Sequence, residues 1–215
     1  MFNFQTVGHD LEFVVRDQET REAVSFVDFQ RTTLDSCTIY PDNVLLECNI
    51  DPVAPEDFHA TIKKNIEDIR CFLNSHQLYA DVGCSSALYP RHQLCNKEAH
   101  RIGCQPFYNA YMLGVKLNPQ PYQDQWRFAG GHIHLGFDKN IVPSHFIVKL
   151  LDEYIKDEQS EDIRRDVFYG QRGAYREKPY GLEYRACDNS WVHNPSIIID
   201  AIRKVEQDIN EILEG

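Results

Sequence analysis

The chain has 215 residues, of which 42% are hydrophobic and 26% are charged, as expected for a folded globular protein. Its net charge of −11 at pH 7 argues against general binding to nucleic acid, because an acidic surface is repelled by a phosphate backbone. No segment approaches the roughly 18 consecutive apolar residues of a membrane helix. We therefore expect a protein that binds neither nucleic acid nor membrane.

The seven cysteines form no C-x-x-C pair, and the N-terminal sequence has neither a basic start nor a long apolar run. These features argue against secretion and predict reduced thiols in the cytoplasm. No repeat, low-complexity tract or linker is visible. One domain over residues 1–215 is the simplest interpretation.

The first half of the chain contains several predicted strands. Leu11–Arg16 is one, and Ala23–Phe29 is its expected partner across the polar turn at 17–22. Val44–Ile50 follows a run of turn-forming residues, and Leu78–Val82 is a further short strand.

Three amphipathic patterns predict helices at Pro55–Gln77, Pro143–Lys156 and Pro195–Leu213, the last with Asn194 as its N-cap. Residues 84–122 are rich in Cys, His, Pro and Tyr and are predicted to be mostly irregular. Strands therefore flank a few long helices without regular alternation. This order favours an α+β fold with an antiparallel sheet and helices on one face.

A predicted strand at Arg127–Phe137, RFAGGHIHLGF, places two histidines two residues apart behind two glycines. Alternate residues of a strand share a face, so His132 and His134 point the same way. The glycines Gly130 and Gly131 leave room for a ligand to approach the backbone. Taken alone, the pair is more typical of ordinary histidines on a half-buried strand, because short motifs match by chance.

Carboxylates interrupt three other predicted strands. Asp10 and Glu12 share one face of the first, Glu47 lies within VLLECNI, and Glu183 shares a face with Arg185 in GLEYR, on a strand predicted at 181–186. Each has a simple explanation as a turn, edge or ion-pair residue. A carboxylate within an apolar strand needs a partner or a cation, however, because an isolated buried charge is very costly. Together with the imidazoles, these carboxylates form a ligand set that suits Mg²⁺ or Mn²⁺.

The stretch QRGAYREKPYGLEYR, residues 171–185, is the most basic part of this acidic chain. Its glycines and proline predict a loop that leads into the last strand. Guanidinium groups bind phosphate oxygens in a bidentate way, so a polyphosphate is a suitable ligand. A solvated loop with local salt bridges is the alternative. The candidate cations are Arg127, Arg172, Arg176, Lys178 and Arg185.

A competing metal site is conceivable in the irregular stretch, where cysteines and histidines gather at positions 84, 92, 95, 100 and 104. The spacings typical of zinc sites are absent, which favours structural cysteines. The sequence also lacks the G-x-S-x-G, Walker-type and G-x-G-x-x-G motifs. Any ATP would therefore be bound without a Walker loop.

The four polar strands, in this order, resemble the glutamine synthetase-like superfamily of carboxylate–amine ligases, and most closely its phage-type COOH-NH2 ligase (type 2) family. GHDLEF (8–13) is similar to the superfamily's G-x-E-P-E-F strand, with Asp10 in place of the first glutamate. DNVLLECN (42–49) resembles the second acidic strand. RFAGGHIHLG (127–136) and GAYREKPYGLEYR (173–185) resemble the H-x-H strand and the strand that ends in E-x-R.

The resemblance implies a glutamine synthetase-like curved antiparallel sheet in a single catalytic domain, residues 1–215, that binds ATP and two or three Mg²⁺ or Mn²⁺ ions. It implies attack of a carboxylate on the γ-phosphate of ATP, followed by displacement of phosphate from the acyl phosphate by an amine. The substrates would be amino acids, peptides or proteins, and peptide tagging is compatible with this chemistry. If the chain is phage-encoded, the compartment is the host cytoplasm.

The resemblance also assigns roles by motif position. The implied metal ligands are Asp10, Glu12, Glu47, His132 and Glu183. The implied catalytic residues are Arg185, which would face the γ-phosphate, together with Glu183 and Arg176. The implied nucleotide-binding residues are Arg127, His134, Arg172, Arg176, Lys178 and Arg185.

Two other functions are compatible with the residues. A metal-dependent hydrolase could use the H-x-H pair and the carboxylates to activate water, although a hydrolase of neutral substrates has no need of the basic stretch. A non-catalytic protein could retain the fold. Superfamily members often assemble into rings or dimers, so a homo-oligomer is also an open alternative.

Overall fold

The computed structural model describes residues 1–100, 107–112, 115–118, 124–155, 165 and 170–215. Within them, antiparallel strands accompany three α-helices: α1 (Phe58–Asn74), α2 (Ser144–Tyr154) and α4 (Ser196–Glu214). This architecture confirms the predicted α+β class. No helix in this part of the chain is long and apolar enough to cross a membrane.

The main sheet is built around its longest strand, β1 (Thr6–Asp17). The strand order is β3–β4–β5–β1–β11–β13–β12–β8–β9. The partners are β3 (Thr32–Thr33), β4 (Thr38–Asp42), β5 (Leu45–Asn49), β8 (Phe107–Asn109), β9 (Lys116–Leu117), β11 (Gly131–Gly136), β12 (Ala174–Lys178) and β13 (Gly181–Tyr184). The end of β1 also pairs with β2 (Ala23–Val24) and β6 (Leu78–Asp81).

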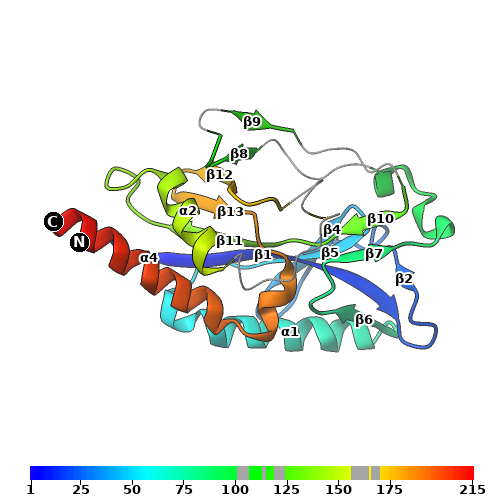
Figure 1. Ribbon diagram of the computed structural model, residues 1–215. Helices are drawn as coiled ribbons and strands as arrows, with labels where there is room; N and C mark the ends of the chain where they lie inside the picture. The colour runs from blue at the N-terminus through cyan, green and yellow to red at the C-terminus, as the bar shows by residue number, and fades with distance from the viewer. Residues whose placement is uncertain (101–106, 113–114, 119–123, 156–164, 166–169) are drawn as a thin grey trace.

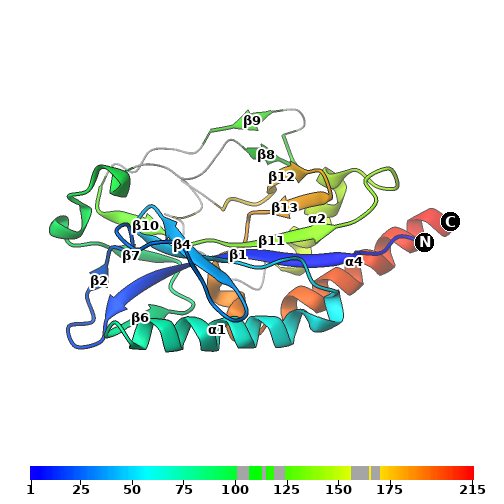
Figure 2. The ribbon, with the colours of Figure 1, turned by 180° about the vertical axis from the view of Figure 1, so that it is seen from behind.

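Short elements complete the chain. The strands β7 (Ser86–Leu88) and β10 (Trp126–Phe128) form a separate two-stranded sheet. The 3₁₀-helices are η1 (Pro55–Asp57), η2 (Arg91–Leu94), η3 (Lys97–His100) and η5 (Asn189–His193). The two termini lie side by side at one end of the molecule (Figures 1 and 2), where the backbone N–H of Phe2 donates to Asn210 Oδ1 at 2.6 Å.

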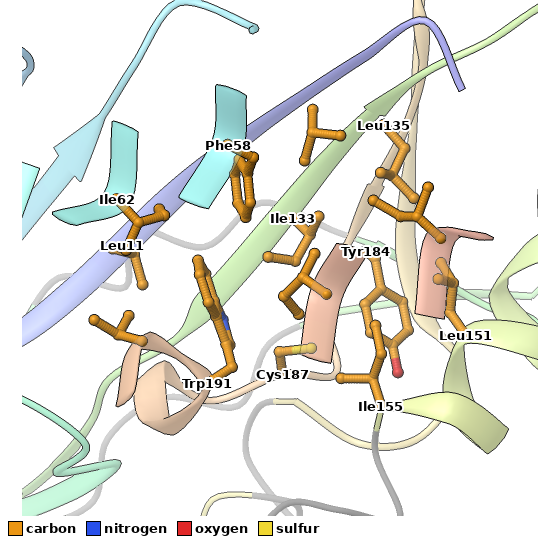
Figure 3. Packing of buried hydrophobic residues seen from close by; sticks show 14 of the residues in the cluster. Leu11, Phe58, Ile62, Ile133, Leu135, Leu151, Ile155, Tyr184, Cys187 and Trp191 are labelled. Atoms are coloured by element: carbon orange, nitrogen blue, oxygen red, sulfur yellow. The ribbon is translucent and has the colours of Figure 1, made fainter. Parts of the chain in front are cut away.

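The hydrophobic core lies between the sheet and the helices. Leu11 of β1, Ile133 of β11 and Tyr184 of β13 point toward the same layer (Figure 3), and all are at most 1% exposed. Phe58 from α1 and Leu151 from α2 pack into this layer. Because side chains alternate along a strand, the residues between these positions point to the opposite face. That face carries the predicted polar groups.

Two expected strands differ from the observed ones. The predicted strand 127–137 is two strands in different sheets, because the chain leaves the ladder at Ala129–Gly130, and the N–H of Gly130 donates to Glu12 Oε2 at 2.7 Å. The predicted strand 23–29 is regular only at Ala23–Val24. The hydrogen bond between Gly130 and Glu12 joins residues far apart in the sequence, so local periodicity does not predict it.

The predicted loop at 171–180 is wrong, because it contains β12. Lys178 pairs with Gly181, so Pro179 and Tyr180 form the turn of a tight hairpin. Gly181 has φ +152°, and an added Cβ would lie 2.0 Å from the carbonyl oxygen of Leu135. The glycine and proline therefore mark a hairpin turn between two strands and not a loop.

The predicted helices are observed with shifted ends. The first is divided into η1 and α1 and ends at Asn74. The last starts at Ser196, with Pro195 rather than Asn194 in the cap position and no side-chain cap hydrogen bond. The predicted end of the middle helix, Lys156, lies outside the described residues. In the described part of 84–122, the chain forms β7, β8, β9 and two 3₁₀-helices, so it is less irregular than predicted.

Candidate functional site

Strand register brings the polar residues of five strands together on one face. Asp10 lies opposite His132 of β11 and opposite Asn49 of β5. Glu12 lies opposite Glu47. Further along β11, His134 lies opposite Glu183, and Glu183 in turn lies opposite Arg176 of β12. The sequence predicted that Asp10 and Glu12 share a face and that His132 and His134 do so, and the register makes Asp10 and His132 neighbours across strands.

The first group of candidate metal ligands consists of Asp10, His132 and Glu183. Each offers a ligand atom, and the three atoms lie within 4.8 Å of one another. Three different strands supply them, namely β1, β11 and β13. His132 and Glu183 are 3% and 0% exposed, whereas Asp10 is half-buried. The group therefore lies at the boundary between the protein interior and solvent.

Three cations surround Glu183. Arg185 binds its Oε1, Lys178 Nζ lies 2.8 Å from its Oε2, and Arg176 Nη1 lies 3.3 Å from its Oε1. Arg185 also lies 3.4 Å from Nδ1 of His132 through its Nη1 atom. A single buried carboxylate thus orients three of the predicted phosphate-binding residues.

These contacts determine the charge states of the buried pair. Burial alone would raise the pKa of Glu183, but Arg185 and Arg176 lower it far below its ordinary value, so Glu183 is ionised. Burial and the nearby Arg185 lower the pKa of His132 well below its usual value. His132 is therefore a neutral imidazole at pH 7, the form that binds metals.

A second group of candidate ligands consists of Glu12, Asp42 and Glu47, whose ligand atoms also lie within 4.8 Å of one another. Glu12 and Glu47 were predicted from sequence. Asp42 was missed, because its place in a Pro-Asp-Asn run indicated a turn. In the structure it ends β4, and β4 pairs with β5 beside Glu47. Its position at the start of the acidic motif 42–49 was the signal that could have identified it.

The second group is electrostatically strained. Burial, together with Glu12 and Asp42, raises the pKa of Glu47 well above its ordinary value. Burial also raises the pKa of Asp42, although Arg185 and Arg176 oppose this effect. The hydroxyl of Tyr40 donates to Glu47 Oε1 at 2.5 Å. Carboxylates this close either share a proton or hold a cation between them.

His134 is positioned by two side chains. Its Nε2 lies 2.8 Å from Asp10 Oδ2, and its Nδ1 is hydrogen-bonded to the hydroxyl of Tyr180. Burial, followed by Glu183 and Asp10, raises the pKa of Tyr180 above its ordinary range. Tyr180 lies in the β12–β13 turn and was not predicted from sequence, because nothing in a turn tyrosine indicates a site.

Two predicted nucleotide-binding residues are placed apart from this arrangement. Arg127 is 0% exposed on β10 and donates to the carbonyl oxygens of Ala99, Asp124 and Trp126. Arg172 is exposed, and its charge acts on Asp152 of α2. The nucleotide-binding role of both residues stays a prediction. The contacts of Arg127 are those of a residue that holds neighbouring backbone segments together.

Buried polar contacts hold the chain segments that border the site. Arg165, 1% exposed, donates to the carbonyl oxygens of Ala129 and Ala186 at 3.2 and 3.1 Å and to that of Cys187. The amide of Asn189 donates to the carbonyl oxygen of Glu12 at 2.8 Å. Both residues were missed by sequence analysis, because a buried arginine or asparagine leaves no local pattern.

The donor sets fit divalent cations. The second group offers only carboxylate oxygens, which hard cations such as Mg²⁺ prefer. The first group adds an imidazole, which is compatible with Mn²⁺ as well. The alternative zinc site receives no support in the described part of the chain, where the cysteines and histidines between 84 and 100 form no such group. Cys104 lies outside the described residues.

An antiparallel sheet that gathers carboxylates, an imidazole and cations on the face opposite its helices has the groups expected of a metal-assisted enzyme acting on phosphates. Residues 119–207 match the family model described as Phage phiEco32-like COOH.NH2 ligase-type 2. The match includes the H-x-H strand and the E-x-R strand, and over these residues it confirms the predicted resemblance to this family. The family name indicates ligases that join a carboxylate to an amine. No curated protein matches the chain.

Proposed function

We propose that this protein is an ATP- and Mg²⁺-dependent ligase that forms an amide or peptide bond through an acyl-phosphate intermediate. The observation that carries the proposal is the group of three cations held around the buried carboxylate of Glu183, directly beside two groups of candidate metal ligands. Cations and carboxylates in contact are the groups that bind a metal–polyphosphate.

In the proposed reaction, an oxygen of the substrate carboxylate attacks the γ-phosphorus of ATP, and the bond from that phosphorus to the bridging oxygen breaks, so ADP leaves. The amine nitrogen then attacks the acyl carbon. Inorganic phosphate leaves with the bonding electrons, and the nitrogen loses its proton to give the amide. Both steps move negative charge on phosphate oxygens, which fixed cations stabilise.

The chain's own residues have separate tasks in this scheme. Arg185 and Arg176 donate hydrogen bonds to the transferring phosphoryl oxygens, and Lys178 contributes a compact positive charge. Glu183 keeps these cations in position. Asp10, His132 and Glu183 would hold one divalent ion, and Glu12, Asp42 and Glu47 would hold another. Such ions neutralise the phosphates and polarise their oxygens.

The test is ATP consumption with Mg²⁺ or Mn²⁺ and a panel of amino acids and peptides, with mass spectrometry to detect the amide product. We expect turnover that chelation abolishes, and a loss of about 100-fold or more in Glu183→Gln, as for removal of a key electrostatic group. Amide formation without ATP would instead indicate a transferase, and peptide cleavage without ATP would indicate a hydrolase; either result would refute the proposal.

Glu177→Gln is the matched control. Glu177 lies on the neighbouring strand β12, but its carboxylate accepts from Ser144 Oγ of α2 at 3.0 Å and pairs with Lys139 at 2.6 Å. The same chemical change there leaves the candidate site intact, so we expect turnover within about twofold of the wild type, as for surface substitutions. Thermal unfolding of both variants separates loss of activity from loss of fold.

A further inference from the structure

A polar pocket lies at one edge of the main sheet, between the β3–β4 hairpin and the end of β5. Its volume is about 420 Å³, within the range of small-molecule sites in proteins. Polar and charged side chains supply most of its wall: Arg31, Thr33, Asp35, Thr38, Asn49 and Asp51. No residue of this wall was predicted from sequence to bind a ligand.

The wall of the pocket is held in place by hydrogen bonds. Within the hairpin, the backbone N–H of Leu34 donates to the carbonyl oxygen of Cys37 at 2.8 Å. The N–H of Ser36 donates to Asp68 Oδ2 of α1 at 3.0 Å, and Asp68 also pairs with Lys64. The hairpin is thus tied to a helix, and the pocket is formed before a ligand binds.

The pocket offers charges of both signs that are not used in ion pairs. The guanidinium of Arg31 stacks over the ring of Tyr40 at 5.0 Å. Among the residues that the structure describes, Arg31, Asp35 and Asp51 form no salt bridge within 4.0 Å. A ligand that carries both a carboxylate and an ammonium group complements such a wall, because each charge meets an opposite one.

The pocket also adjoins the candidate site. Thr38 lies opposite Asn49, and Asn49 lies opposite Asp10, so the wall is one strand away from the first ligand group. Neighbouring strands are roughly 4.8 Å apart. The amide of Asn49 donates to the hydroxyl of Tyr40 at 3.0 Å, and this hydroxyl donates to Glu47. A ligand held at Asn49 would therefore lie one strand away from Asp10.

We propose that this pocket binds the amine-bearing substrate as a zwitterion, an amino acid or the end of a short peptide, with its carboxylate at Arg31 and its ammonium at Asp51. The inference rests on the proposed ligase function for the identity of the reaction. Asn49 lines the pocket and lies opposite Asp10, so it would lie between the bound amine and the candidate site. The assignment makes Arg31 a determinant of amine specificity.

Direct binding tests the pocket without catalysis. Calorimetry or ligand-observed NMR is carried out on the full chain with the twenty common amino acids and with glycylglycine. The best ligand is then compared with its N-acetyl and its C-terminal amide forms. We expect each blocked form to bind at least about tenfold more weakly, because each loses one of the two charged groups that the wall would bind.

Arg31→Gln should weaken the best ligand by at least about tenfold, as for a lost charge-assisted hydrogen bond, and leave the affinity for ATP within about twofold. Arg70→Gln is the control, because Arg70 is exposed on α1 and outside the pocket wall. In turnover assays, Arg31→Gln should raise the KM of the amine more than that of ATP. Amino-acid binding that Arg31→Gln leaves unchanged would overturn the proposal.

The two proposals fail in different ways. If the wild-type protein makes an amide from ATP but Arg31→Gln behaves like Arg70→Gln, the ligase assignment stands and the pocket assignment is wrong. If amino acids bind in an Arg31-dependent way but no ATP-dependent product forms, the pocket is real and the ligase assignment is wrong. Binding of glycylglycine but of no free amino acid would identify the substrate as a peptide end.

Discussion

Glu12 and Glu47 lie directly opposite each other on the adjacent antiparallel strands β1 and β5. Opposed like charges destabilise a sheet, and here Asp42 adds a third carboxylate. Their proximity and burial raise the pKa of Glu47 well above its ordinary value. Folding thus brings together charges that the unfolded chain keeps apart, which is the arrangement of a site that binds cations.

The first prediction concerns the cost of this arrangement. A carboxyl whose folded pKa is raised reduces stability above its unfolded pKa. Glu47→Gln should therefore raise the unfolding free energy of the metal-free protein at pH 7, by roughly 1 kcal/mol or more. The Tyr40 hydroxyl keeps an acceptor in this variant. Urea unfolding in the presence of a chelator measures the change.

Metal addition provides the complementary measurement. Mn²⁺ or Mg²⁺ should raise the melting temperature of the wild type, because a ligand of the folded state stabilises it. The increase should be smaller in Glu47→Gln. Glu67→Gln, an exposed change on α1, should behave as the wild type in both measurements. Equal metal-induced shifts in all three proteins would exclude Glu47 as a ligand.

The second prediction concerns pH. His9 is 1% exposed on the core face of β1, with its ring edge-on to those of Phe58 and Trp191, and its Nε2 lies 3.0 Å from the amide of Asn65. Burial lowers its pKa to about 4. Between this value and about 6.5 the unfolded state binds more protons than the folded state, so stability falls as pH falls.

The loss attributable to His9 should reach roughly 3 kcal/mol at the acidic end of this range. His9→Gln removes the titrating group, so the difference in unfolding free energy between variant and wild type should change in favour of the variant on acidification. His59→Gln, on the exposed face of α1, is the control. A pH-independent difference would show that His9 does not titrate in this window.

The third prediction concerns the ion cluster around Glu183. Arg185 and Glu183 are 3% and 0% exposed, and removal of one partner leaves a buried charge poorly compensated. Arg185→Met should destabilise the fold by roughly 3 kcal/mol or more. Lys178→Met should cost clearly less, because the side chain of Lys178 is 27% exposed.

A double-mutant cycle checks the cause of this effect. If the loss comes from the uncompensated carboxylate, Arg185→Met combined with Glu183→Gln should destabilise the protein by less than the sum of the single changes. Strict additivity would contradict a direct coupling between the two residues. Denaturant unfolding of the four proteins gives the required free energies.

The fourth prediction concerns the hairpin that joins β12 to β13. Gly181→Ala places a methyl group at φ +152° and 2.0 Å from the carbonyl oxygen of Leu135, so we expect a loss of roughly 2 kcal/mol or more. Gly8→Ala is the matched control, since the nearest atom to its added Cβ is 3.5 Å away. If the Gly181→Ala and Gly8→Ala variants had equal unfolding free energies, the result would contradict the hairpin geometry.

Local pattern alone determined a large part of this protein. Alternation along a strand assigned Asp10 and Glu12 to one face, and it did the same for His132 and His134, because side chains of a strand have a period of two. Three-and-four spacing identified the helices, although their ends shifted by a few residues. The last two motifs, at 127–136 and 173–185, lie within the family-model match at residues 119–207.

Only the tertiary structure decided which residues meet. Asp10 faces His132, and Asp42 joins Glu12 and Glu47, because of strand register and hairpin position, and neither is encoded within one segment. The predicted strand 127–137 ends its regular pairing near Gly130, which donates to Glu12. Arg127 and His132 therefore lie on different strands, β10 and β11. Periodicity reports the face on which a side chain lies, whereas contacts between distant segments depend on the whole packed sheet.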